Sequence, residues 1–175
     1  MIETSPTDED LMARIQKDDA DAYQALFERH QQRIYGFLVR KMGNRQSADD
    51  VFQDTFLSVY RARQTWKPGR KVRPWLFSIA ANAARDHGRK VRRTPEMVEL
   101  NDSPTSTDQP EARLDLEAAI LKLPETLREA FLLGVVEGMD HNEIADALTI
   151  SPSNARARVC RARAQLRKTM RSAAP

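Results

Sequence analysis

The sequence predicts an all-α protein made of two small helical domains joined by a flexible linker, the C-terminal one a helix-turn-helix. Apolar residues recur at three- and four-residue steps along most of the 175-residue chain, which is the period of an amphipathic helix. No segment alternates apolar and polar residues with β-branched enrichment, so we expect no strands. A stretch rich in proline and polar residues, 95–110, interrupts the helical pattern and predicts the linker.

The N-terminal domain, 8–94, contains three clear helical patterns. The first runs from Ala20 to Lys41 and ends at Gly43-Asn44. The second follows a predicted cap at Ser47, and the third spans about Arg73 to Arg93. The expected buried positions are Tyr23, Leu26, Phe27, His30, Ile34, Phe37 and Leu38, then Ala48, Val51, Phe52, Thr55, Phe56 and Val59, then Trp75, Leu76, Ile79, Ala80, Ala83 and Ala84.

The C-terminal domain, 111–172, ends in the pattern of a helix-turn-helix. Pro124 suits the first turn of a helix, and residues 140–143 resemble a capping box that opens a short helix through Leu148. Ser151 then supplies a cap, and Pro152 suits the first position of a longer basic helix. A short helix, a tight turn and a longer helix form the motif whose second helix enters the major groove of DNA.

A helical wheel divides the final helix into two faces. The stripe expected to be buried holds Ala155, Val159, Ala162 and Leu166. Small residues opposite that stripe allow close approach to base edges, while flanking arginines reach phosphates. DNA is therefore favoured over a merely solvated helix, and over anionic lipid because the stripe is narrow and lacks Trp or Phe. The outer face carries Ser153, Ala157, Cys160, Arg161, Ala164, Lys168 and Arg171, flanked by Arg156, Arg158, Arg163 and Arg167.

Charge is distributed in blocks. The net charge is −4 over 1–60, +10 over 61–93, −10 over 94–150 and +7 over 151–175. Two basic blocks on predicted helices indicate contacts with a polyanion, although solvated surfaces remain an alternative. Cationic residues surround Trp66 in the first block, and a cationic groove with an aromatic platform suits single-stranded nucleic acid.

Several classes of protein are not indicated. The chain lacks GxGxxG and phosphate-loop motifs, a Cys/His cluster with zinc spacing, and an apolar run near the roughly 20 residues of a spanning helix. We expect no cofactor, no metal, no catalytic residue and no membrane insertion. The N-terminal residues lack the layout of a signal peptide, which predicts a cytoplasmic protein. The acidic residues are expected at helix caps, on helix surfaces or in the linker.

Four ordered motifs carry a resemblance to a known family. They are the segment 47–57, the segment 75–86, the pattern from Leu123-Pro124 through Phe131-Leu132 to Gly138, and residues 143–145 with 156–163. Together they resemble bacterial sigma factors, and more narrowly the extracytoplasmic-function group (group 4) of the sigma-70 family, which keeps only the second and fourth conserved regions. The linker is too short for a third folded domain and agrees with this group.

The resemblance implies a promoter-specificity subunit that is not an enzyme. Such a protein binds core RNA polymerase through the β′ clamp helices and the β flap, recognises and melts promoter DNA, and is often held by an anti-sigma factor. The resemblance assigns core-polymerase binding to one helix face, and the wheel agrees because these residues project away from the Val51 stripe. They are Asp49, Asp50, Gln53, Asp54 and Leu57.

The resemblance also assigns DNA contacts to both domains. The loop from Trp66 to Lys71 would receive an extruded base of the melted minus-ten strand, and a prepared pocket offsets the cost of extrusion. The minus-ten residues are Arg61, Arg63, Trp66, Lys67, Arg70, Lys71, Asn82, Arg85, Arg89 and Lys90. The minus-thirty-five residues are Ser151, Ser153, Asn154, Arg156, Ala157, Arg158, Cys160, Arg161, Arg163 and Arg167.

Two alternatives remain open from sequence. One is a helix-turn-helix transcriptional regulator that binds its site without replacing a sigma factor. That alternative gives no reason for the second basic block with its aromatic residue. The other is a nucleic-acid enzyme, against which no carboxylate cluster or serine nucleophile stands out at a plausible spacing.

Overall fold

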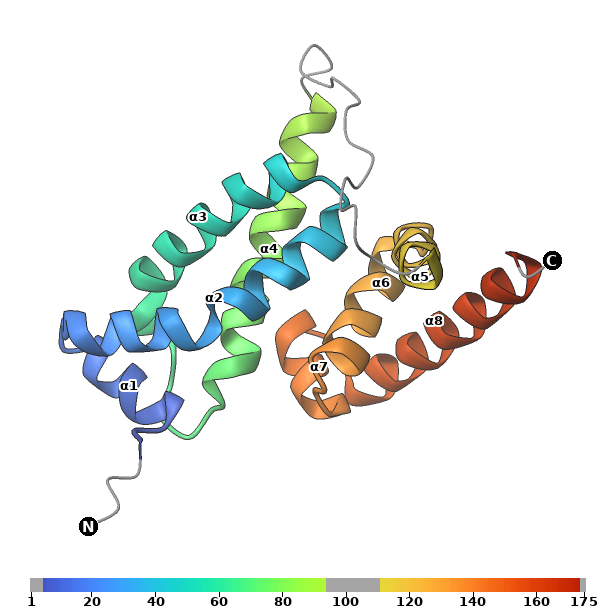
Figure 1. Ribbon diagram of the computed structural model, residues 1–175. Coiled ribbons are helices and arrows are strands. Elements are labelled where there is room, and N and C mark those ends of the chain that lie inside the picture. Colours follow the sequence, from blue (N-terminus) through green and yellow to red (C-terminus); the bar gives the residue numbers. More distant parts are fainter. Residues whose placement is uncertain (1–4, 94–110, 174–175) are drawn as a thin grey trace.

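The computed structural model describes residues 5–93 and 111–173, and every regular element in those ranges is helical (Figure 1). The elements are α1 (Asp8–Ile15), α2 (Ala20–Met42), α3 (Arg45–Ala62), the 3₁₀ turn η1 (Arg63–Thr65), α4 (Val72–Arg93), α5 (Glu111–Leu121), α6 (Glu125–Phe131), the π-helical turn η3 (Leu132–Val136), α7 (His141–Leu148) and α8 (Pro152–Ala173). The all-α prediction is confirmed, and the expected linker 95–110 lies outside the described residues. None of the described helices is both long and apolar enough to span a bilayer.

An N-terminal bundle is formed by α1 to α4, in which α2, α3 and α4 pack side by side (Figure 1). The helical periodicity places Leu26, Ile34 and Leu76 in its centre, where they are fully buried. Phe37 and Phe77 meet edge to face with ring centroids 5.4 Å apart, a favoured aromatic geometry. The predicted stripes are therefore confirmed at their centres. Six of the residues predicted to be buried are only partly so: Tyr23, Phe27, Phe52, Trp75, Ile79 and Ala83.

The turn between α2 and α3 differs from the prediction at one residue. Gly43 ends α2 in the left-handed conformation with φ 69°, which glycine adopts without a steric penalty. Asn44, and not Ser47, caps α3: its side-chain oxygen accepts a hydrogen bond from the Ser47 backbone N–H at 2.8 Å. Asn44 is among the best N-cap residues, so the helix begins at Arg45. Pro124 likewise precedes α6 at the cap position and does not occupy its first turn.

The short helix α1 was not predicted, because eight residues give a weak periodic signal. Thr7 and Asp10 form a reciprocal capping box at its start. Leu11, Met12 and Ile15 are completely buried against the bundle. This helix therefore completes the apolar core of the N-terminal bundle.

Polar contacts attach the start of α1 to α2. Asp8 accepts hydrogen bonds from Arg29 at 2.6 Å and from the His30 ring at 2.8 Å. Burial opposes the charge of Asp8, but the hydrogen bonds from His30 and Arg29 outweigh it and lower the pKa of this carboxyl group.

A C-terminal bundle is formed by α5 to α8. The capping box between Asp140 and Glu143 is present as predicted and opens α7. Ser151 accepts a hydrogen bond from the Asn154 backbone N–H at 3.2 Å, as expected of a cap for α8. Gly134 lies so close to α7 and α8 that an added Cβ would be 3.0 Å from Ile144 Cδ1 and 3.3 Å from Val159 Cγ2. The helix-turn-helix is therefore packed directly on η3.

The two bundles lie against each other in the structure. The N-terminal helix α4 packs on α7, and α2 packs on α5, α6 and η3 (Figure 1). At one end of this seam Gly43 lies so close to Leu121 that an added Cβ would be 2.8 Å from the leucine Cδ2 atom. The seam is therefore tightly packed at this end.

Replacing Asp8 by Asn should lower the free energy of unfolding by about 1–3 kcal/mol, because charged hydrogen bonds at the α1–α2 contact are lost. Since folding lowers the pKa of Asp8, its stabilisation is present above the unfolded value of about 3.9 and lost as the pH falls through the folded pKa. Urea titrations of both proteins at pH 7 and pH 3 measure this. The exposed Asp146→Asn serves as the control, and equal loss in both variants would contradict the assignment.

Candidate nucleic-acid and partner interfaces

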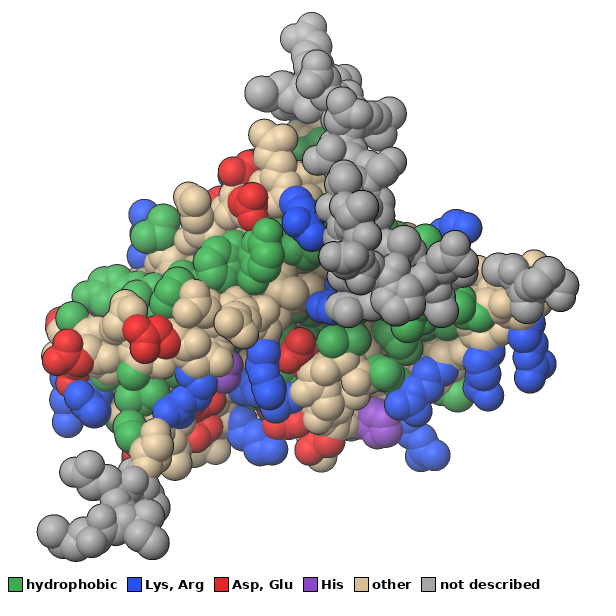
Figure 2. All heavy atoms as spheres, in the orientation of Figure 1, with side chains coloured by type: hydrophobic (Ala, Val, Ile, Leu, Met, Phe, Trp, Pro, Cys, Tyr) green, Lys and Arg blue, Asp and Glu red, His purple; other side chains and the backbone are tan. Residues whose placement is uncertain are grey.

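The outer face of α8 is open, as the wheel predicted. Ala155, Val159, Ala162 and Leu166 are buried against the bundle. Figure 2 shows cationic side chains spaced along the outer edge of this helix. Among the predicted duplex-contacting residues, Asn154 and Arg158 are partly buried and hydrogen-bonded to each other, and the others are exposed: Ser151, Ser153, Arg156, Ala157, Cys160, Arg161, Arg163 and Arg167.

A shallow hollow follows this face between the N-termini of α7 and α8. Its walls combine small residues with the N-terminal ends of two helices, where the Asp140 and Ser151 side chains cap backbone N–H groups. The lining residues are Asp140, His141, Asn142, Pro152, Ser153, Arg156, Ala157 and Cys160. The outer face of α8 has small side chains along its middle and arginines on both sides. A helix face of this kind suits insertion into the major groove of DNA.

The solvent-facing side of α3 forms a second surface. Leu57 has 54% of its surface exposed, and Asp49, Asp50, Gln53 and Asp54 are also exposed around it. The opposite side of the helix is anchored by buried Val51, Thr55 and Val59. The packed side of α3 holds the helix in place, so its exposed leucine and carboxylates can contact a partner protein. Such a partner would need an apolar surface with basic residues around it.

Trp66 does not form the open stacking surface that the sequence predicted. It is 3% exposed, and its indole N–H donates a hydrogen bond to the Arg70 carbonyl at 3.2 Å. The Gln16 side chain donates to the carbonyls of Arg63 and Trp66, at 2.9 Å each. Trp66 therefore stabilises the 63–71 segment as a buried residue, because burial of its large apolar ring is favourable.

The remaining basic residues of 61–93 point in different directions. Arg63 turns toward the N-terminal end of α2, where it pairs with Asp18 at 2.6 Å and lies 4.2 Å over the Tyr60 ring. Lys71 and Arg85 pair with Glu143 and Glu129 across the seam between the bundles, and Asn82 accepts a hydrogen bond from Arg85 Nη1 at 2.7 Å. The other predicted minus-ten residues are exposed: Arg61, Lys67, Arg70, Arg89 and Lys90.

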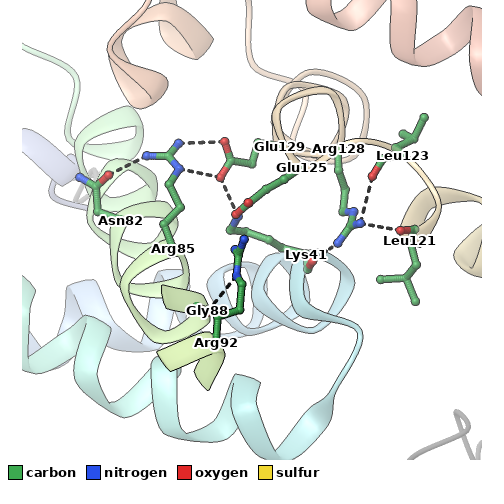
Figure 3. Close-up of polar contacts among 10 residues, drawn as sticks. All are labelled: Lys41, Asn82, Arg85, Gly88, Arg92, Leu121, Leu123, Glu125, Arg128 and Glu129. Atoms are coloured by element: carbon green, nitrogen blue, oxygen red, sulfur yellow. Dashed lines mark hydrogen bonds and ion pairs between the residues drawn. The ribbon is translucent and has the colours of Figure 1, made fainter. Parts of the chain in front are cut away.

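A charged cluster at the seam was missed by sequence reasoning. Glu129, only 1% exposed, accepts a hydrogen bond from Lys41 Nζ at 2.6 Å (Figure 3). Arg85 donates two hydrogen bonds to the same carboxylate, from Nε at 2.9 Å and from Nη2 at 2.8 Å. Glu125 also accepts from Lys41, at 2.7 Å. The expectation that acidic residues lie at caps, on surfaces or in the linker is therefore wrong for Glu129.

The electrostatics of this cluster follow from its contacts. The hydrogen bond to Glu129 raises the pKa of Arg85 against the opposing effect of burial. The hydrogen bond from Lys41 lowers the pKa of Glu125, although partial burial opposes it. Both shifts favour the charged forms of Arg85 and Glu125.

Arg128 ties the cluster to the ends of two helices. Its guanidinium donates to the Lys41 backbone carbonyl at 2.6 Å, and to the carbonyls of Leu121 and Leu123 (Figure 3). These contacts satisfy carbonyl groups that lack partners at helix C-termini. Burial lowers the pKa of Arg128.

Further contacts join the beginning of α4 and the residue before it to the C-terminal bundle. Lys71 pairs with Glu143 at 2.9 Å, and this hydrogen bond raises the pKa of the lysine. Arg73 donates to the Glu137 backbone carbonyl. Burial raises the pKa of the Glu137 side chain, opposed by Arg33, Arg73 and other neighbouring cations.

Comparisons with known proteins agree with this architecture. The family model of sigma-70 region 2 matches residues 26–94, and that of sigma-70 region 4 matches residues 113–166. The chain is 39% identical over 165 residues to the RNA polymerase sigma factor CarQ of Myxococcus xanthus, covering 91% of this chain and 95% of that protein. It is 30% identical over 184 residues to the RNA polymerase sigma-H factor of Pseudomonas aeruginosa, covering 95% of each.

A solved structure resembles the whole chain. CnrH in complex with the cytosolic domain of CnrY superposes with a TM-score of 0.74 at 28% identity, covering 95% of this chain and 99% of that one. The fold and the two matched regions define a promoter-specificity subunit of bacterial RNA polymerase. The chain belongs to the sigma-70 family of RNA polymerase sigma factors, in its extracytoplasmic-function group.

Replacing Trp66 by Ala should lower the free energy of unfolding by about 3–5 kcal/mol, the usual cost of removing a buried aromatic ring. The measurement is chemical unfolding followed by circular dichroism. The control Lys67→Ala changes an exposed neighbour and should have little effect. If Trp66→Ala unfolds at the same denaturant concentration as the control, the residue is not the structural anchor of the loop.

Proposed function

We propose that this chain binds core RNA polymerase in the cytoplasm and directs it to promoters, with domains at 8–94 and 111–172 and a tether at 95–110. The observation that carries this proposal is the coexistence of an open cationic α8 face and a separate α3 face with exposed Leu57. One surface suits duplex DNA and the other suits a protein partner. Two surfaces on one small chain fit a subunit that links polymerase to promoter.

The polymerase-binding role is proposed for the α3 face, consisting of Asp49, Asp50, Gln53, Asp54 and Leu57. Exposed acidic residues around one leucine match an interface with an apolar centre and a polar rim. The expected contact is the β′ clamp helices, and the C-terminal bundle is expected to contact the β flap. RNA synthesis itself then belongs to core polymerase, and this chain needs no catalytic group.

The minus-thirty-five role is proposed for α8, with small residues at the base edges and arginines at the backbones. The minus-ten role is proposed for the exposed cations Arg61, Lys67, Arg70, Arg89 and Lys90, for Lys71 and Arg85 at the seam, and for Asn82, which is hydrogen-bonded to Arg85. Trp66 supports this surface from below. Phosphate contacts of this kind hold a strand, while base contacts select it.

An anti-sigma factor is also proposed as a partner. The support is that the sigma factor RpoE of Bartonella quintana, which has a similar fold, was solved in complex with the anti-sigma factor NepR, and that CnrH was solved in complex with the cytosolic domain of CnrY. The exposed α3 face of this chain offers a surface that such a protein could cover.

In vitro transcription on a random promoter library is the decisive test of function. Core polymerase with this chain should start RNA at a defined set of promoter sequences that core polymerase alone does not use. A helix-turn-helix regulator would instead bind duplex DNA without polymerase and leave the start sites unchanged. That outcome would overturn the proposal.

Leu57→Asp should weaken binding to core polymerase by about tenfold or more, because a central apolar contact of an interface is commonly worth over 1 kcal/mol. The fold should persist, since 54% of the Leu57 surface is exposed. Titration of labelled protein with core polymerase measures the affinity. Ser58→Asp on the same helix is the control, and equal affinities for the two variants would remove Leu57 from the interface.

Arg161→Ala should cost about 1–3 kcal/mol on preferred promoters and relax selection at one base position, as expected of a base-reading residue. Arg167→Ala should weaken all duplexes alike and reduce the salt dependence, as expected of a phosphate contact. Both residues are exposed on α8. Library selection at two salt concentrations compares the variants, and matching profiles would show that this division of roles is wrong.

A further inference from the structure

The seam between the bundles places acidic groups of one bundle on cations of the other. The most buried of these groups is the Glu129 carboxylate, which forms ion pairs with Lys41 of α2 and Arg85 of α4 (Figure 3). Lys71 meets Glu143 in a more exposed pair at the same seam. This pattern agrees with the sequence, in which the block 61–93 carries +10 and the block 94–150 carries −10.

The contacts at Glu129 differ from ordinary surface ion pairs. Exposed pairs contribute little, because water solvates both partners and salt screens them. Lys41 is 4% exposed and Glu129 is 1% exposed, so neither charge is solvated while the bundles are joined. Removing one member of such a group leaves the other charge buried and uncompensated, which is strongly unfavourable. The seam therefore depends on the negative charge of Glu129.

The geometry at Glu129 is that of an anion site. Arg85 donates through Nε and Nη2 to the two carboxylate oxygens, the forked arrangement with which arginine also binds phosphate. Lys41 Nζ and Arg85 Nε both lie within 2.9 Å of the same oxygen, Glu129 Oε1. Two cations that share one carboxylate oxygen are placed to share one phosphate oxygen.

The second bundle also contacts two cations at the other end of α4. Lys71 and Arg73, which precede and begin α4, bind Glu143 and the Glu137 carbonyl. While the contacts of the seam hold, a nucleic-acid strand cannot reach Lys41 Nζ or the Nε and Nη2 edge of Arg85, because Glu129 occupies both. The C-terminal bundle thus occupies part of the surface proposed for the minus-ten strand.

We propose that Lys41 and Arg85 form a phosphate-binding pair for the promoter strand, and that Glu129 occupies this pair in the free chain until the bundles separate. The proposal rests on the minus-ten role given to Arg85 above, and it adds Lys41 as a DNA-binding residue and Glu129 as the group that masks both. A strand phosphate and the Glu129 carboxylate compete for one site. Polymerase binding or a strand that separates the bundles exposes the pair.

The test uses the full-length chain without polymerase. Binding of a fluorescent single-stranded oligonucleotide is followed by anisotropy, and the radius of gyration is measured by small-angle X-ray scattering. Glu129→Gln should enlarge the particle and tighten strand binding by about tenfold or more, because apparent affinity scales with the populated open fraction. Glu28→Gln is the control, since it removes one negative charge from an exposed residue outside the seam.

A second pair of variants tests the phosphate site itself. Adding Lys41→Gln to Glu129→Gln should remove most of the gain in strand affinity. The particle should stay enlarged, because Arg85 still lacks its carboxylate partner. Full retention of the gain would exclude Lys41 from the site. If Glu129→Gln fails to fold, the double variant Glu125→Gln/Glu143→Gln weakens the seam at the two more exposed carboxylates, and its smaller gain in strand affinity takes the place of the first result.

An unchanged radius and an unchanged strand affinity, relative to Glu28→Gln, would overturn the masking proposal. That result is separate from the function test, because no polymerase is present. A chain that opens and binds the strand yet never redirects core polymerase would contradict the proposed function and leave the masking intact.

Discussion

The ion pairs of the buried Glu129 carboxylate hold the two bundles in their observed arrangement. Lys41 comes from the end of α2 and Arg85 from the middle of α4, and both reach a single acidic group on α6. A carboxylate buried to this degree is tolerated only when cations compensate it. Arg128 adds hydrogen bonds to the carbonyl ends of neighbouring helices, so the charged groups and the helix termini stabilise one another. The seam is consequently specific in geometry.

The same requirement connects structure to function. The cations Lys41 and Arg85 need an anionic partner, and either a carboxylate or a phosphate can supply the negative charge. The two side chains are therefore suited to exchange the Glu129 carboxylate for a phosphate. The α8 face and the Leu57 face are not involved in this exchange, because both are exposed on the outside of the molecule. Partner binding at those faces and release of the seam are therefore physically separate events that a polymerase complex can couple.

Features of the fold that depend only on neighbouring residues could be predicted from the sequence. The apolar stripe of α8, the capping box at Asp140 and the end of α2 at Gly43 were all predicted, because each depends on residues within a few positions of one another. The cap of α3 was misplaced by one turn because Asn44 and Ser47 are both good caps. Helix α1 was missed because its length gives little periodicity, although Thr7 and Asp10 form a capping signal.

The helical class, the helix-turn-helix, the family motifs and the blocks of opposite charge can all be read from the amino-acid sequence. Which charges meet depends on how the helices pack. Lys41 and Glu129 are 88 residues apart, and no local pattern joins them, although Lys41 continues the phase of the buried α2 stripe through Ile34 and Phe37. The burial of Trp66 was likewise decided by tertiary packing, since a tryptophan among arginines fits a core anchor and a stacking surface equally well. Burial and long-range pairing depend on how helices pack, and periodicity along one helix does not specify its neighbour.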